Sequence, residues 1–283
     1  MKMEVTPLLE NIVDCYIALN SVLNTTANNH INYEIMNKVL NLSKIAIIPT
    51  ATIILSLIMY SEVCERTLDM QRNGFSQNTS FSFVLTLCFS LGISYIVVSY
   101  SPKILFAITE VADNILNNVI SISIGTGTQL SAPTVEELGR AFYGDAYNAN
   151  YKIPLGDYMF STMIIGISKF ASWLASLSVS IVMYSREISI YTLTALAPIA
   201  LATIPHKEHS HIAKSFIRTY VATALISVVL VISLKVLSLI IYTIPSAEIS
   251  IDGYAKQVLL ISIVQITTIF GSATLSKKII SAM

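Results

Sequence analysis

Long apolar runs separated by short polar stretches dominate this 283-residue sequence. A membrane-spanning α-helix needs about 20 predominantly apolar residues, and six runs come close to that length or exceed it. They cover residues 45–61, 81–100, 158–184, 188–204, 219–244 and 255–275. The pattern predicts an all-α fold, a polytopic integral membrane helical bundle with about six transmembrane helices, and counts from five to seven are compatible with it.

Two further segments have helical periodicity but only one apolar face. The first lies in the N-terminal region, where these positions recur at helical spacing: Leu8, Ile12, Cys15 or Tyr16, and Leu19. Such a helix lies on a membrane or on a partner and does not cross alone. The second covers residues 103–124, where five polar residues crowd the face opposite the apolar stripe: Glu110, Asp113, Asn114, Asn117 and Asn118. Because these residues are costly against lipid, an interfacial or protein-buried helix is favoured, and a seventh span stays open.

The apolar runs divide the chain into four regions. Residues 1–44 form an amphipathic N-terminal helical region, 45–124 a first membrane region, 125–156 a polar loop and 157–283 the core membrane region. Within the polar loop we expect a short helix at residues 135–142. Thr134 directly precedes this helix and Glu137 lies in its first turn, and this spacing is that of a capping box.

Prolines and charges predict where the helices end. Pro102 follows the second run and would end that helix, because proline lacks a backbone donor. Arg186 and Glu187 separate the third run from the fourth and predict a tight turn there. Pro198 lies inside the fourth run, frees a backbone carbonyl and would bend the helix.

The composition agrees with a membrane protein. Charged residues make up 12% of the chain and hydrophobic residues 54%, whereas an average soluble domain has roughly 25% charged residues. The 17 basic and 17 acidic residues cancel, which excludes a basic nucleic-acid binder or an acidic disordered tail on bulk charge alone.

The positions of the basic residues predict the orientation, because cytoplasmic loops are enriched in Lys and Arg. The loop and helix start after the fourth run hold Lys207, Lys214 and Arg218, whereas no basic residue follows the fifth run until Lys256. We therefore expect a multi-pass protein of the cell membrane with a cytoplasmic C-terminus. Six spans would place the N-terminus inside, and a seventh span at 103–124 would place it outside.

Several polar side chains lie within the predicted spans. A stripe of four serines recurs every fourth residue along the third span: Ser168, Ser172, Ser176 and Ser180. Because small hydroxylated residues favour close helix packing, we interpret the stripe as a packing surface. The alternative interpretation is that the stripe faces a water-filled passage. Lys169 and Lys235 also lie within spans, where a lysine needs a partner, a cavity or the interface.

No pattern of residues indicates an enzyme. There is no nucleophile–base pair, carboxylate dyad or dinucleotide fingerprint, and the three cysteines, Cys15, Cys64 and Cys88, match no disulfide framework or metal motif. His206, His209 and His211 share the short stretch HKEHSH without an HExxH motif. We interpret this stretch as a solvated basic loop and expect no catalytic residue, cofactor or bound metal.

One stretch carries a family resemblance: SREISIYTLTALAPIALATIPHKEHSHIAKSFIRTYVATAL, residues 185–225. Its Arg-Glu-Ile start, its Ala-Leu-Ala-Pro-Ile-Ala-Leu-Ala centre and the later Ser-His-Ile-Ala-Lys-Ser-Phe-Ile-Arg resemble the TrbL-type conjugal transfer family, in particular members from Gram-positive conjugative elements. These proteins are polytopic inner-membrane subunits of type IV secretion systems. The resemblance is close over about 40 residues and looser over the hydropathy plan of about 150–283.

The resemblance implies a channel or scaffold subunit that helps to pass single-stranded DNA or protein across the membrane. It implies a homo-oligomer with an ATPase, a coupling protein and a cell-wall hydrolase as partners. It also implies that this chain catalyses no reaction. Arg186, Glu187 and Pro198 would shape a hairpin, and Lys207, Lys214 and Arg218 would face a coupling partner or transient single-stranded DNA. The alternatives are a small-solute permease with a site near Lys169 or Lys235, and a phage-type or scaffold membrane protein without a substrate.

Overall fold

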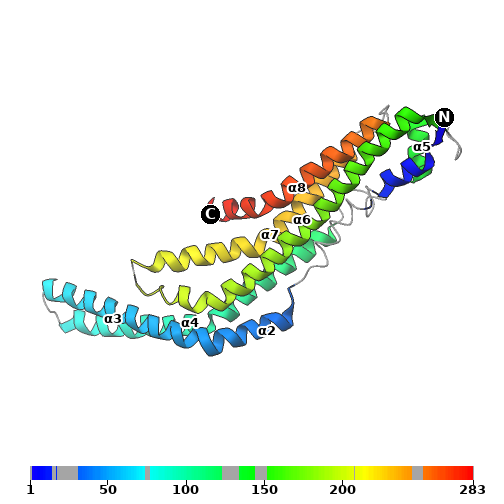
Figure 1. The fold of residues 1–283 in the computed structure, drawn as a ribbon. Coiled ribbons are helices and arrows are strands. Elements are labelled where there is room, and N and C mark those ends of the chain that lie inside the picture. The colour runs from blue at the N-terminus through cyan, green and yellow to red at the C-terminus, as the bar shows by residue number, and fades with distance from the viewer. Residues whose placement is uncertain are drawn as a thin grey trace. The chain divides into compact units, whose positions relative to one another are not determined.

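Helices make up most of the chain. The computed structural model describes residues 2–14, 17, 31–73, 77–122, 134–143, 152–206, 208–243 and 251–282 (Figure 1). Residues 6–14 are helical, and the other elements are β1 (Lys2–Glu4), α2 (Tyr33–Leu42), the π-helical segment η1 (Ser43–Ile47), α3 (Ile48–Asn73), α4 (Gln77–Ser121), α5 (Val135–Tyr143), β2 (Lys152–Pro154), α6 (Leu155–Leu201), α7 (Ser210–Thr243) and α8 (Ile251–Ala282). The predicted helical membrane class is confirmed.

Five segments of the described chain are long and apolar enough to cross a membrane: Tyr33–Leu68, Leu85–Ser121, Leu155–Leu201, Ser210–Leu237 and Leu259–Ile280. This number lies within the predicted range of five to seven and below the preferred six. The difference arises because the predicted third and fourth spans form one helix. Likewise, residues 103–121 continue the second span and do not form a separate amphipathic helix.

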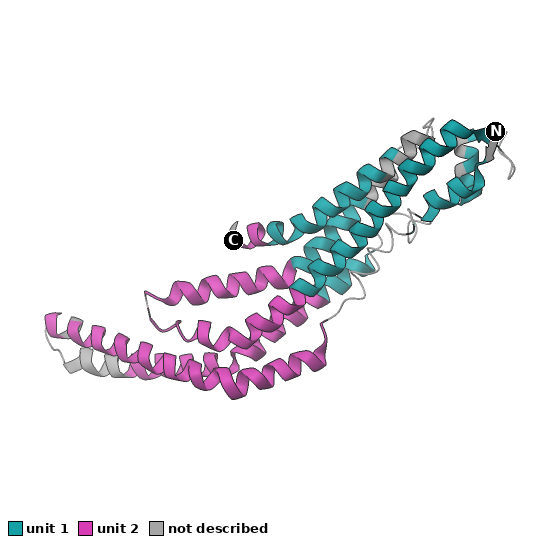
Figure 2. Cartoon of the chain, in the orientation of Figure 1, with its two compact units in different colours: residues 1–30, 114–185, 226–276 teal, residues 31–113, 186–225, 277–283 magenta. Residues whose placement is uncertain are grey.

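The chain forms two compact units (Figure 2). Unit 1 contains residues 1–30, 114–185 and 226–276, and unit 2 contains residues 31–113, 186–225 and 277–283. The long helices α4, α6, α7 and α8 each contribute residues to both units. Each unit has its own apolar clusters and is described by itself.

Helix α6 is continuous over 47 residues, so the tight turn predicted at Arg186 and Glu187 is wrong. The prediction assumed that charged residues must leave the apolar helix. Instead, the Arg186 side chain is buried and pairs with Asp113, so no loop is needed to expose it. Pro198 also lies inside α6, and the predicted hairpin does not form. At 1.5 Å per residue the helix is about 70 Å long, more than twice the roughly 30 Å hydrocarbon core.

Helix α4 continues through Pro102, contrary to the prediction that it would end there. Proline removes the N–H that would bind the carbonyl four residues earlier, which is that of Val98. The hydroxyl of the buried Ser101 donates to this same carbonyl at 2.7 Å. A side-chain bond thus replaces the missing backbone bond, and the helix runs on to Ser121.

The end of the predicted N-terminal helical region (residues 1–44) and the first span also join into one continuous helical stretch. The π-helical segment η1 connects α2 to α3 and ends two residues before Pro49. A π-helical turn pairs each N–H with the carbonyl five residues back, and the Ile48 N–H indeed bonds to the Ser43 carbonyl. This wider turn lets the helix accommodate a proline near the junction. The Ser43 hydroxyl donates to the Ala195 carbonyl of α6.

In unit 1, the N-terminal residues pack on the ends of two long helices. Leu8 and Ile12 are each 1% exposed and belong to one apolar cluster with Ile153, Ile165 of α6 and Ile261 of α8. Strand β1 pairs with β2 in antiparallel register, Met3 opposite Ile153. The apolar face predicted for this helix is therefore buried within the same chain, while Cys15, Tyr16 and Leu19 lie outside the described residues.

The capping box predicted for the central helix is confirmed. The Thr134 N–H donates to Glu137 Oε2 at 2.9 Å, and the Glu137 N–H donates to Thr134 Oγ1 at 3.2 Å. The hydrogen bond from the Thr134 backbone, followed by that from its side chain, lowers the pKa of Glu137. Val135 and Tyr143 of α5 pack against the N-terminal cluster. Residues 125–133 and 144–151 of the predicted loop lie outside the described residues.

Three further apolar clusters form the cores of the units. Unit 1 contains a cluster between α6, α7 and α8: Val179, Met183, Leu230, Leu234 and Ile269. Unit 2 contains one cluster around α4, α6 and α7: Ile31, Met36, Leu105, Ile190, Ala197 and Tyr220. Its second cluster lies between α3, α4 and the end of α6: Ala51, Leu55, Met59, Val98 and Ala202.

Candidate functional site

The central feature of unit 2 is a buried charged group shared by three helices. Arg186 of α6 donates from Nη2 to Asp113 Oδ1 of α4 at 3.0 Å and to the Ala224 carbonyl of α7 at 3.1 Å. The Arg186 side chain is 0% exposed and that of Asp113 is 12% exposed. Ionisable residues in membrane helices are rare and usually mark functional positions, so this pair is the first candidate for a functional site.

The hydrogen bonds of this centre are incomplete. Among the described residues, Nε and Nη1 of Arg186 and Oε1 of the adjacent Glu187 are buried without a hydrogen-bond partner. An arginine presents five donors in a fixed fork, and only one of its nitrogens is used here. The centre therefore contains both unpaired donors and an unpaired acceptor.

A hydroxyl cluster lies next to the charged pair on the same helix faces. Tyr220 of α7 has its hydroxyl 2.6 Å from Thr109 Oγ1 of α4 and 3.1 Å from Thr194 Oγ1 of α6. Thr109 precedes Asp113 by one helical turn, and Tyr220 precedes Ala224 by one turn. All three hydroxyls are buried. Since buried hydroxyls without partners are costly, this arrangement fixes the register of the three helices.

The interior polar groups are suited to holding the helices together. Removing one partner of a buried ion pair costs about 3–5 kcal/mol, because the other charge is left uncompensated. The pair therefore ties α4, α6 and α7 together strongly. The sequence had placed Asp113 on the polar face of 103–124, but the spacing alone could not identify Arg186 as its partner.

The serine stripe lies in unit 1, along the face of α6 that meets α8. Ser168 and Ser172 are 1% and 0% exposed, whereas Ser176 and Ser180 are half-buried. Ser168 and Ser172 donate to carbonyls one turn earlier in α6. Ser172 Oγ also lies 3.1 Å from Ser262 Oγ of α8, so this part of the stripe takes part in close helix packing.

The two lysines within the predicted spans both bind groups of unit 1. Lys169 Nζ donates to Asn11 Oδ1 at 2.6 Å and to Asp14 Oδ2 at 2.9 Å, which ties the N-terminal helix to α6. Lys235 Nζ of α7 donates to three carbonyls at the C-terminal end of α4, those of Val119, Ile120 and Ile122. Since α4 has no basic residue in its own last turn, Lys235 caps it from a neighbouring helix.

The predicted basic face is partly visible. Lys214 and Arg218 are exposed and lie one turn apart on α7, whereas Lys207 lies outside the described residues. The neighbouring histidines were expected in a solvated loop, and only part of this expectation holds. His209 and His211 are exposed, but His206 is 2% exposed and contacts α3, so the prediction is wrong for His206. Sequence reasoning missed this residue because its partners, Ser61 and Glu65, are about 140 positions away.

The fold and the five long apolar helices define a polytopic helical membrane protein, and its buried polar residues include the Arg186–Asp113 ion pair. Residues 18–198 match the family model described as TrbL/VirB6 plasmid conjugal transfer like protein, and residues 128–280 match a second model with the same description. The chain belongs to the TrbL/VirB6 family and is a membrane component of a conjugal transfer system. No curated protein and no solved structure matches the chain.

Proposed function

We propose that this protein is a channel or scaffold subunit of a conjugative type IV secretion system that helps to move single-stranded DNA or protein across the cytoplasmic membrane. The family match over more than half of the chain carries the proposal. The chain acts without chemistry of its own, and partner ATPases supply the energy. The coupling protein and the cell-wall hydrolase are its further partners.

The interior of the described chain supports passage between subunits. Several buried charges and hydroxyls bind one another or backbone carbonyls of the same chain, as Arg186, Tyr220 and Lys235 do. Apolar clusters pack between the helices within each unit. A path for a polar substrate therefore forms between copies of this chain in a homo-oligomer. The two alternative functions, a permease and a scaffold without substrate, have no specific observation in their favour.

We further propose that each of the five candidate spans crosses once. With a cytoplasmic C-terminus, as predicted from Lys207, Lys214 and Arg218, the N-terminus then lies outside. This arrangement places two basic connections in the cytoplasm: Arg66 and Arg72 at the end of α3, and Lys214 and Arg218 after α6. Within unit 2 these connections lie together, because Ser61 of α3 contacts His206, which supports a common membrane side.

Accessibility to a membrane-impermeant maleimide tests this topology. Cys64 and Cys88 are exposed and are first replaced by serine, so that Cys15 is the sole cysteine of one variant. A second variant carries a single cysteine at Ser250, expected outside. Labelling of both positions in intact cells is the expected result. If Cys15 reacts only after the cells are permeabilised, the N-terminus is inside and the five-crossing arrangement is wrong.

Conjugation frequency tests the function. An in-frame deletion should abolish transfer, and the wild-type chain supplied in trans should restore it. Lys214→Glu/Arg218→Glu reverses the exposed basic face without touching the core and should reduce transfer, whereas Lys256→Glu, an exposed lysine of α8, should not. Unchanged transfer in the deletion strain would contradict the proposal.

Contact with the substrate separates a channel from a scaffold. Formaldehyde cross-linking during transfer, followed by immunoprecipitation of the tagged chain, should recover the transferred DNA strand. The control is a donor that lacks the relaxase, in which no strand is transferred and no DNA should be recovered. Recovery that is equal in both donors would leave the scaffold function as the better account.

A further inference from the structure

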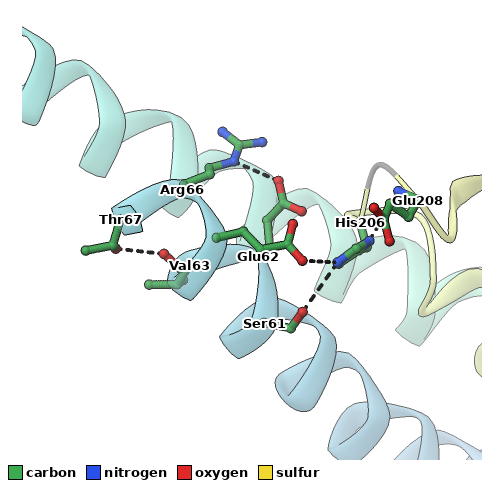
Figure 3. A network of polar contacts seen from close by, with 8 residues as sticks. Ser61, Glu62, Val63, Arg66, Thr67, His206 and Glu208 are labelled. Atoms are coloured by element: carbon green, nitrogen blue, oxygen red, sulfur yellow. Dashed lines mark hydrogen bonds and ion pairs between the residues drawn. The ribbon is translucent and has the colours of Figure 1, made fainter. Parts of the chain in front are cut away.

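The polar end of α3 and the connection between α6 and α7 bring two carboxylates and an imidazole together in unit 2 (Figure 3). Glu62 and Glu65 are three residues apart and lie on one face of α3. His206 Nε2 lies 3.3 Å from Ser61 Oγ and 3.5 Å from Glu65 Oε1. One donor atom from each of Glu62, Glu65 and His206 lies within 4.8 Å of the other two.

The burial of the cluster distinguishes it from a chance group of surface acids. Glu62 is 5% exposed and His206 is 2% exposed, and they come from segments about 140 residues apart in the sequence. Arg66 donates from Nε to Glu62 Oε1 at 2.7 Å and compensates one of the two carboxylates. With a neutral imidazole, the cluster retains one negative charge beside a buried nitrogen ligand.

We propose that Glu62, Glu65 and His206 form a binding site for a divalent transition-metal ion such as Zn²⁺ or Mn²⁺. Imidazole together with carboxylate oxygens suits these ions, whereas Mg²⁺ and Ca²⁺ prefer ligand sets of oxygen alone. Donor atoms around a tetrahedral Zn²⁺ lie about 3.4 Å apart. Small rotations of the glutamate side chains bring the three donors to that separation, and the Glu65 side chain, at 57% exposed, is free to make one.

Metal binding requires a change of tautomer at His206. The Glu208 backbone N–H donates to Nδ1 of His206 at 3.2 Å, so the neutral ring carries its proton on Nε2. A metal ion on Nε2 takes the lone pair there, the ring proton moves to Nδ1, and the Glu208 hydrogen bond is given up. Protons compete with metal for the imidazole and the carboxylates, so the affinity falls as the pH falls.

Occupation of the site would tie the α6–α7 connection to α3. The stretch that follows His206 leads directly into α7 and its exposed basic residues, Lys214 and Arg218. Metal binding would therefore hold in place the same connection that we propose to face the cytoplasm. The site itself does not depend on that function, since its ligands and their geometry belong to the folded chain alone.

Thermal unfolding of the purified full-length protein in detergent tests the site. After EDTA treatment and its removal, ZnCl₂ or MnCl₂ should raise the Tm, because a ligand that binds only the folded state stabilises it, and MgCl₂ should not. In Glu65→Gln, whose side chain is largely exposed, the Tm without metal should stay unchanged and the metal-induced rise should disappear. The matched control is Glu208→Gln, an exposed neighbouring carboxylate, which should keep the rise.

Direct binding completes the test, since exposed histidines also attract Zn²⁺. The background variant His209→Ala/His211→Ala should bind one metal per chain by calorimetry, and Glu65→Gln or His206→Gln in this background should bind none. Co²⁺ in the same background should give visible d–d absorption that disappears with His206→Gln. Metal binding that persists with Glu65→Gln, or a Tm that MnCl₂ and ZnCl₂ leave unchanged in the wild-type chain, would overturn the proposal.

Discussion

The two units solve the problem of charge in an apolar chain in different ways. Unit 2 buries a complete ion pair, Arg186 with Asp113, and surrounds it with hydroxyls from three helices. Unit 1 keeps its lysines near the ends and edges of helices, where Lys235 binds the carbonyls that end α4 and the half-exposed Lys169 binds the N-terminal helix. The described interior of unit 1 between these sites is made of serines, Gln265 and apolar residues.

This difference predicts where a substitution should most reduce the free energy of unfolding. Removing one member of a buried pair leaves the other charge uncompensated. The carbonyls at a helix end, in contrast, can bind water when a capping lysine is lost. We therefore expect unit 2 to depend on a few residues and unit 1 to tolerate the loss of single charges. Three measurements, ordered by expected effect, test this contrast.

The largest effect is expected from breaking the ion pair of unit 2. Arg186→Met leaves Asp113 buried without a partner and should lower the free energy of unfolding by about 3–5 kcal/mol, measured by thermal or denaturant unfolding in detergent. Arg186→Met/Asp113→Leu removes both charges and should recover most of this loss. If the double variant is as unstable as the single variant, the pair contributes through packing and not through charge.

The double variant also separates stability from transfer. If it accumulates at the wild-type level but fails in conjugation, the charged centre has a role in transfer besides holding the helices. If it restores both accumulation and transfer, the centre is a structural device of unit 2. Either result decides whether the unpaired nitrogens of Arg186 and the Glu187 oxygen matter for the substrate.

An intermediate effect is expected at the helix cap of unit 1. Lys235→Met removes the donor of three hydrogen bonds to the end of α4 and should cost about 1–2 kcal/mol. Hydrogen exchange should increase in the last turn of α4 and stay unchanged around Arg186. Lys256→Met, an exposed lysine on α8, is the matched control. A loss as large as that of Arg186→Met would mean that unit 1 also depends on a single buried charge.

The smallest effect is expected at α5, where Glu137 caps the helix in full contact with solvent. Since its pKa is lowered in the folded chain, its contribution is complete above the ordinary glutamate pKa and is lost as the pH falls through the lowered value. The protection of the first-turn amides of α5 against hydrogen exchange, expressed relative to the intrinsic exchange rate at each pH, should therefore fall on acidification. Glu137→Gln should remove this dependence, and Glu136→Gln should preserve it. A pH-independent first turn in the wild-type chain would contradict the cap.

Local signals in the sequence predicted some elements correctly and others not. The capping box of Thr134 and Glu137 needs only residues three positions apart, and it formed as predicted. Pro102 carries an equally strong local signal for a helix end, yet Ser101 binds the carbonyl that the proline leaves free. The residue that supplies this bond is adjacent in the sequence, but the proline signal alone does not show whether the serine hydroxyl makes it.

The contacts of the candidate site were harder to predict from the sequence than the helix ends. Arg186 resembled a loop residue because its partner, Asp113, is 73 positions away, and His206 resembled a solvated histidine because Ser61 and Glu65 come from α3. Lys235 was recognised as a lysine in need of a partner, but periodicity could not name the carbonyls of α4. In each case the missing information was the identity of a neighbour from a distant helix.

The sequence by itself determined the helical membrane class, the range of span numbers and the family, because apolar run length and short motifs are properties of neighbouring residues. Only the tertiary structure decided that Arg186 stays inside one long helix, that Lys235 caps α4, and that His206 joins two glutamates of α3. The physical reason is that a charge in an apolar chain is stable wherever a partner compensates it, and helix packing alone determines where that partner lies.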